Sequence, residues 1–355
     1  NHWEEAYTTA KDAVTRLKTN GYELFTKTTQ PAVYGNGPGA AFRQLVTQNA
    51  DYSATPRDKE TIFQVRSGSV FVWHIGYIGS NMPNTYKSGT SPTQELVDAF
   101  ETVDGKPVLD LAKPYKDEKH LQPNYNSVNT LYDPNNPYAN RDPRLYETVL
   151  MNGSVMQFDS KPVKIETFVG GAHQVSFDVT NRSASRTGYY HNKMVTPGAS
   201  GNNQINNSNW KYYRLGETML DFAEAAAEAG HLEEARAAAN EVRARSGMPN
   251  LPAGLSQQEL VLRIRNERRV ELAWEEQRYF DLRRWQKPDG DLSETCKWFT
   301  AMVITKNGDG SFTYKRQNIS NNPRGGWQNR DLLLPLPLNE AATLESVTGQ
   351  KWQNP

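Results

Sequence analysis

The amino-acid sequence predicts a mainly α-helical fold, built from tetratricopeptide-like helical pairs with long irregular loops and a few short β-hairpins. Two neighbouring segments in the C-terminal half carry apolar residues at three- and four-residue spacing and are joined by a tight turn, which is typical of an antiparallel helical pair. The 355 residues include 25 glycines and 20 prolines, and only 37% are hydrophobic. Long ordered loops should therefore surround a modest core.

Charge and composition exclude several classes of partner. Forty basic and forty acidic side chains give a net charge of 0, and no block rich in Lys and Arg stands out. We therefore expect neither nucleic acid nor an anionic membrane surface as a partner. The longest apolar run, residues 332–338, contains two prolines and is too short to span a bilayer. Cys296 is the one cysteine, which excludes an internal disulfide and a cysteine-based zinc site.

The first predicted helix covers residues 3–19, and Asn20-Gly21 supplies its C-terminal stop. One helix cannot bury its apolar stripe alone, so we expect that further sequence precedes this chain in the full protein and that the fold is N-terminally truncated here. We expect one domain, 1–355, with four parts: the end of a tetratricopeptide-like unit (1–30), a loop-rich ligand-binding part (31–209), a helical pair with a following helix (210–290) and C-terminal loops (291–355).

The loop-rich part should contain only short elements. A short helix is predicted around Phe42–Val46, and weak alternation between Thr61 and Val72 is consistent with a strand. Ser91-Pro92 should open another short helix, since proline is tolerated in a first helical turn. Residues 146–151 read as extended, and residues 181–209 read as an irregular loop.

The helical pair is expected at 212–229 and 232–245, with Gly230-His231 as the turn. Small residues at Gly216, Ala223 and Ala235 let two helices approach closely. This helix–turn–helix pattern is typical of one tetratricopeptide unit.

A capping box, Ser256-x-x-Glu259, opens the next helix, which can run to about Trp285 before Pro288 forbids continuation. Glu267 and Glu271 fall on its apolar face, and so does Arg278. One explanation is a buried ion network that recruits nearby arginines, for which we name Arg268, Arg269 and Arg278. The other is a catalytic carboxylate pair. We favour the network, because an unpaired buried charge is very costly.

No motif indicates catalysis, a cofactor or a metal. The six histidines are isolated, and the chain lacks a nucleophile elbow, a phosphate loop and a dinucleotide fingerprint. Asn307-Gly308-Asp309-Gly310 lies between two apolar stretches and predicts a hairpin turn; the alternating carboxylates of a calcium loop are absent. We therefore predict no catalytic residue, no cofactor and no metal.

One loop combines aromatic and amide side chains in the way that a sugar-binding site requires. A sugar ring has an apolar C–H face and polar hydroxyls, so a binder needs an aromatic platform with polar groups beside it. The predicted ligand-binding residues of this loop are Trp73, His74, Tyr77, Asn81 and Tyr86. The equally weighted alternative is that Trp73 and Tyr77 pin the loop to the core.

Four further tryptophans lie outside this loop. Trp298 and Trp327 are weaker candidates for ligand binding, and for Trp327 we favour anchoring of its loop. Trp274 and Trp285 are expected in the core.

The segment Glu267–Trp285, with the sequence ERRVELAWEEQRYFDLRRW, resembles the signature helix of the SusD/RagB family. Further echoes lie in family order across nearly the whole chain. They are Pro92–Phe100, Asn140–Arg144, Tyr213–Glu217 continuing to Ala225, Asn240–Gly247, Leu334–Glu340 and Gln353–Pro355.

The resemblance implies an α-helical lipoprotein on the outer surface of Bacteroidetes. Such proteins pair with a SusC-like TonB-dependent outer-membrane transporter and capture oligosaccharides, or in some members peptides. Relatives begin with a signal peptide and an acylated cysteine, so membrane attachment through an N-terminal lipid is implied by the resemblance alone. The alternatives that remain are a peptide binder, a tetratricopeptide adaptor and, least favoured, a helical glycosidase.

Overall fold

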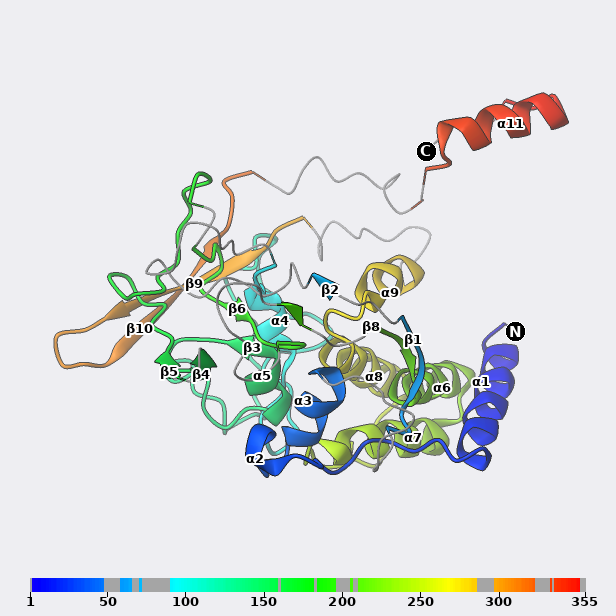
Figure 1. Cartoon of the computed structure of the whole chain (residues 1–355), viewed down its shortest axis with the longest axis horizontal. Helices are drawn as coiled ribbons and strands as arrows, with labels where there is room; N and C mark the ends of the chain where they lie inside the picture. The colour runs from blue at the N-terminus through cyan, green and yellow to red at the C-terminus, as the bar shows by residue number, and fades with distance from the viewer. Residues whose placement is uncertain are drawn as a thin grey trace.

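A computed structural model describes residues 2–47, 58–65, 70–71, 90–158, 161–181, 184–195, 205–206, 210–285, 297–322, 333 and 335–351. Helices packed side by side form one half of the molecule, and loops with short hairpins form the other (Figure 1). The mainly helical fold agrees with the prediction.

Four helices supply the apolar core of the helical half: α1 (His2–Thr19), α6 (Leu215–Ala229), α7 (Leu232–Arg245) and α8 (Gln257–Glu271). Helix α6 packs against the other three, and its alanines are nearly all buried. The helix at 3–19 and the pair 215–245 are thus confirmed, because apolar and small residues recur there at helical spacing. Gly230, in the left-handed conformation with φ of 93°, ends α6.

The start of the pair was wrongly predicted. Residues 212–214 belong to strand β8 (Trp210–Arg214), which pairs antiparallel with β1 (Thr61–Val65). The strand expected within 61–72 therefore exists. Because residues 212 and 213 belong to the strand that pairs with it, these two tyrosines are in a strand and not in the helix. Aromatic residues favour such a pleated surface.

The single helix predicted from 256 to 285 is also wrong. Helix α8 ends at Glu271, and α9 (Gln277–Trp285) follows a turn in which Trp274 and Glu276 have φ of 59° and 65°. The ammonium of Lys193 donates to the carbonyls of Glu271 and Ala273, at 2.9 and 2.7 Å. A buried cation from a distant segment therefore caps the end of α8, which satisfies carbonyls that a continuing helix would have used.

Neither tryptophan expected in the core is fully buried. Trp274 is half-buried and stacks on His191, with ring centroids 4.2 Å apart. Trp285 is half-buried beneath the guanidinium of Arg265, 4.8 Å from its ring centroid.

The loop-rich half holds α2 (Pro31–Tyr34), α3 (Ala40–Thr47), α4 (Gln94–Ala99) and α5 (Pro143–Thr148). The helices expected near Phe42 and after Pro92 are confirmed. Residues 146–148 are helical rather than extended, because Asp142 caps α5 by accepting a hydrogen bond from the Arg144 backbone N–H at 2.9 Å. Only β3 (Val149–Leu150), which follows, is extended.

All the sheets described have two antiparallel strands. Besides β1 and β8, strand β3 pairs with β6 (Tyr190–His191), so part of the segment expected as irregular is paired. The remaining pairs are β2 (Val70–Phe71) with β7 (Ile205–Asn206), β4 (Val155–Phe158) with β5 (Lys161–Lys164), and β9 (Thr300–Lys306) with β10 (Phe312–Asn318). The β9–β10 hairpin confirms the predicted turn at 307–310.

The C-terminal part was expected as loops. It also contains α11 (Leu338–Thr348), which buries no residue and lies apart from the helical half in Figure 1.

Candidate functional site

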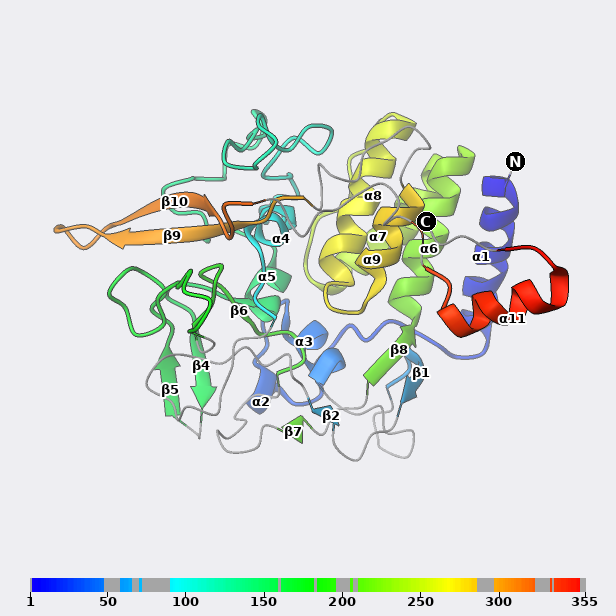
Figure 2. The same cartoon turned by 90° about the horizontal axis from the view of Figure 1, so that it is seen from above.

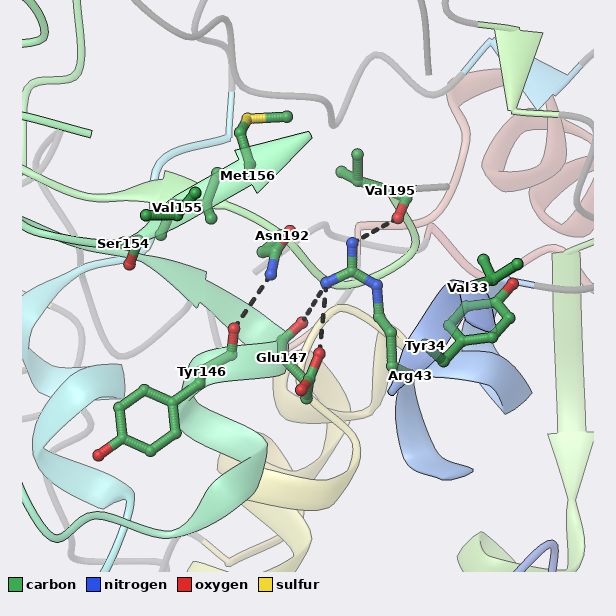
Figure 3. Close-up of a pocket in the computed structure, with 11 residues that line it drawn as sticks. Val33, Tyr34, Arg43, Tyr146, Glu147, Ser154, Val155, Met156, Asn192 and Val195 are labelled. Carbon is green, nitrogen blue, oxygen red and sulfur yellow. Dashed lines mark hydrogen bonds and ion pairs between the residues drawn. The ribbon is translucent and has the colours of Figure 1, made fainter. Parts of the chain in front are cut away.

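A pocket of about 410 Å³ opens where three segments of the loop-rich half meet, residues 33–43, 146–156 and 192–195. We call it the Arg43 pocket; Figure 3 shows its lining. Its size lies within the range of small-molecule sites. The lining residues are Val33, Tyr34, Arg43, Tyr146, Glu147, Leu150, Ser154, Val155, Met156, Asn192 and Val195.

Helix α3 places Arg43 in the wall of this pocket. Its guanidinium donates to the carbonyl of Val195 at 2.6 Å and to the carbonyl of Glu147 at 3.2 Å. Arg43 is 7% exposed, and its burial lowers the pKa of the side chain, although arginine keeps its charge in proteins. A cation held by carbonyls is thus fixed at the pocket wall.

Glu147, at the C-terminal end of α5, is the acidic group of the pocket. Its carboxylate lies 3.7 Å from Arg43, which is too long for a hydrogen bond. Burial raises the pKa of Glu147, and the neighbouring guanidinium opposes that rise. A Cβ at Gly39 would lie 2.7 Å from the Cγ of Glu147, so the helix start at Gly39 packs directly against this side chain.

Apolar and amide groups complete the lining. Val33 and Val155 are 50% and 61% exposed. The Asn192 amide donates to the carbonyl of Tyr146 at 3.0 Å, which holds Asn192 in the wall (Figure 3). Charged, amide and apolar groups that converge in this way can bind a polar molecule with an apolar face, and they contain no nucleophile–base pair.

The charges on α8 lie elsewhere, in the interior. Glu267 and Glu271 are 2% and 0% exposed, and arginines hold the pKa of each carboxyl below its ordinary value against the opposing effect of burial. Glu271 is paired with Arg144, Arg214 and Arg245. Carboxylates kept ionised and covered in this way cannot serve as a general acid for a substrate, so the predicted ion network is confirmed.

Glu267 and Glu271 take arginine partners that the sequence analysis did not name. Arg243 and Arg144 pair with Glu267. Arg268 pairs instead with Asp221 and Asp281.

Most of the residues predicted to bind ligand lie outside the described residues. These are Trp73, His74, Tyr77, Asn81, Tyr86 and Trp327. Trp298 is described: it is 7% exposed, the ammonium of Lys119 lies 5.1 Å from its ring centroid, and it does not line the Arg43 pocket.

The sequence analysis did not identify the pocket residues. The one available signal was Arg43 itself, a charge flanked by apolar residues in a short helix. Among the described residues, no cluster of three His, Cys, Asp or Glu side chains could hold a metal, and no helix is long and apolar enough to cross a membrane.

Comparisons with known proteins agree on the fold. The model of the SusD family matches residues 45–355. A SusD-like protein from Bacteroides fragilis is 26% identical with a TM-score of 0.67, over 96% of this chain and 61% of that protein. The protein BT4246 is 24% identical with a TM-score of 0.73, over 99% of this chain and 62% of that protein.

A third similar structure is a SusD-like carbohydrate binding protein from Bacteroides fragilis. It is 22% identical with a TM-score of 0.51, over 93% of this chain and 69% of that protein. The chain thus spans about three-fifths of the length of the first two structures. A comparison with curated proteins found no match.

Proposed function

Because this chain belongs to the SusD family, we propose that it is part of a non-catalytic cell-surface protein that binds oligosaccharides. The family match over residues 45–355 is the observation that carries the proposal. A similar structure is that of a protein named for carbohydrate binding, which supports the same ligand class. In the full protein, delivery to a SusC-like TonB-dependent transporter and a lipid anchor on the extracellular face of the outer membrane follow from the family resemblance.

The Arg43 pocket supplies chemistry that suits this ligand class. Arg43 and Asn192 present polar groups for sugar hydroxyls, while Val33 and Val155 present an exposed apolar surface for a ring face. We propose that it forms one part of the ligand site. We propose that a second part of the ligand site is formed by the aromatic and amide residues predicted from the sequence, which are Trp73, His74, Tyr77, Asn81, Tyr86 and Trp327. Trp298 is a weaker candidate, because it is buried and does not line the Arg43 pocket.

A panel of plant, host and microbial glycans tests the proposal. We expect the purified chain to retain at least one oligosaccharide and to release no new reducing ends. Reducing ends produced at catalytic turnover would contradict the non-catalytic assignment and favour a glycosidase. Retention of peptides but of no glycan would assign the protein to the peptide-binding class.

A further inference from the structure

The loop 106–140 lies beside the β9–β10 hairpin (Figure 2), and it brings tyrosines next to one another and to β10. The rings of Tyr125 and Tyr132 lie with their centroids 5.4 Å apart. Tyr138 meets Tyr314 of β10 edge-on, at 5.7 Å. We call these four residues the tyrosine surface. Tyr125 is 41% exposed, and the other three are half-buried.

A saturated polar layer lies close to Tyr125 and Tyr132. Arg316, on β10, makes two hydrogen bonds of 2.7 Å to the carboxylate of Asp98. Asp98 also accepts hydrogen bonds from Gln94 at 2.8 Å and from Tyr115 at 2.9 Å. Arg316 and Asp98 are almost fully buried and neutralise one another, so this pair leaves no charge for an external ligand.

A second arginine supports Tyr132. The guanidinium of Arg141 lies 5.4 Å from the ring centroid of Tyr132. It donates to the carbonyls of Val97, Phe100 and Pro137 at 2.6 to 2.7 Å. Arg141 is 1% exposed, so its charge is turned into the protein. The rings therefore rest on a rigid support, which lowers the entropic cost of binding a ligand.

The phenol groups of the surface remain neutral. Burial raises the pKa of Tyr125, Tyr132, Tyr138 and Tyr314 above the ordinary value, so each hydroxyl keeps its proton. A neutral phenol can both donate and accept a hydrogen bond, while its ring offers an apolar face. The hydroxyl of Tyr138 already shares a hydrogen bond of 3.1 Å with that of Tyr189. The exposed ring and hydroxyl of Tyr125, with the phenols beside it, therefore carry the match to the face and hydroxyls of a pyranose.

We propose that the tyrosine surface is a second carbohydrate-binding platform, which takes neutral pyranose rings. The proposal rests on the proposed function, because both assign a glycan ligand. The platform is a second location for glycan binding, separate from the Arg43 pocket. It should also prefer neutral sugars, because Asp98 and Arg316 are paired with each other and offer no free charge to a uronic acid or a sulfated sugar.

Affinity electrophoresis in native gels tests this platform. The gels contain amylopectin, xyloglucan or galactomannan as neutral polysaccharides, or polygalacturonate as the acidic one. We expect at least one neutral polysaccharide to retard the unaltered chain and Tyr125→Ala to weaken that retardation at least about fivefold in Kd. Tyr212→Ala is the matched control, because Tyr212 is 51% exposed on β8 and lies outside the tyrosine surface.

A second variant separates binding from folding. Tyr125→Phe keeps the ring and removes only the hydroxyl, which interacts with Arg316 and Tyr132, so we expect at most a small fall in the melting temperature and a several-fold loss of retardation. Unchanged retardation of both Tyr125 variants, or loss of retardation only together with loss of folding, would overturn the platform.

The outcomes also separate this proposal from the general function. A chain that is retarded by polygalacturonate alone remains a glycan binder, but its platform for neutral sugars is refuted. If a variant in the Arg43 pocket abolishes retardation by a neutral polysaccharide while the Tyr125 variants do not change it, the platform is refuted and the general function is not. A chain that none of the four polysaccharides retards and that retains no glycan in the wider panel refutes both.

Discussion

The guanidinium of Arg144, on α5, donates to the carboxylate of Glu271, on α8, at 2.9 Å, and both side chains have no exposure. This bond joins the loop-rich half to the helical half in the interior. Arg144 also makes hydrogen bonds to Asp142, so the cap of α5 and the ion network share one residue. The network therefore fixes the position of α5, whose last residues line the Arg43 pocket.

Replacement of this carboxylate should harm folding. Glu271→Gln leaves Arg144, Arg214 and Arg245 without their common anion, and breaking a buried pair typically costs about 3–5 kcal/mol. Urea unfolding measures the loss, with Glu233→Gln as the exposed control. A variant of unchanged stability that no longer retains glycan would show that Glu271 belongs to a ligand site.

Glu217 should make stability depend on pH. Burial, together with Asp221 and Glu275, raises the pKa of its carboxyl from 4.5 to about 8. The folded state therefore binds more protons than the unfolded state between these values, and the contribution of Glu217 to stability falls as the pH rises from about 4.5 to about 8. Thermal melts at intervals across this range should show a smaller decline for Glu217→Gln. Parallel curves for the two proteins would contradict the assignment.

The Arg43 pocket can be blocked without disturbing the core. Val155→Arg places a long side chain at an exposed lining position, so stability should change by no more than about 0.5 kcal/mol. We expect binding of the retained glycan to weaken at least about tenfold, a loss of about 1.4 kcal/mol. Val179→Arg is the control, since Val179 is 67% exposed and does not line the pocket. Equal affinity of the two variants would exclude the pocket as a ligand site.

The aromatic loop identified from the sequence calls for its own experiment. Trp73→Ala or Tyr77→Ala should weaken glycan binding by about 1–3 kcal/mol each, because an aromatic anchor is lost. Isothermal titration beside thermal melts checks this. Unaltered affinity in both variants, or an equal loss of affinity and stability, would return these aromatics to a structural role.

Local patterns predicted some elements well and failed where distant residues decide. Helix α1 and the α6–α7 pair follow from apolar periodicity within each segment. The break after Glu271 does not, because Trp274 and Glu276 adopt positive φ without being glycine, and Lys193 from another part of the chain caps the helix there. Rules based on local sequence do not include contacts between residues that are distant in the chain.

The same limit applies to the candidate site. The presence of buried charges on α8 could be predicted from their position on an apolar face, but the pairing of Glu271 with Arg144, and of Arg268 with Asp221 and Asp281, depends on tertiary structure. The Arg43 pocket is lined by residues from three separate segments, and none of these segments carries a motif of its own.

The interior ion pairs have a consequence for chimeric proteins. Each half of the molecule supplies counterions to the other: Glu60 to Arg214 and Arg245, Glu101 to Arg243, Arg144 to Glu267 and Glu271, and Lys193 to Glu275. A recombinant that joins one half of this chain to the other half of a relative would fold only if both parents carry the same complementary charges. Recombination is therefore restricted to parents that match at these positions, whatever their overall identity.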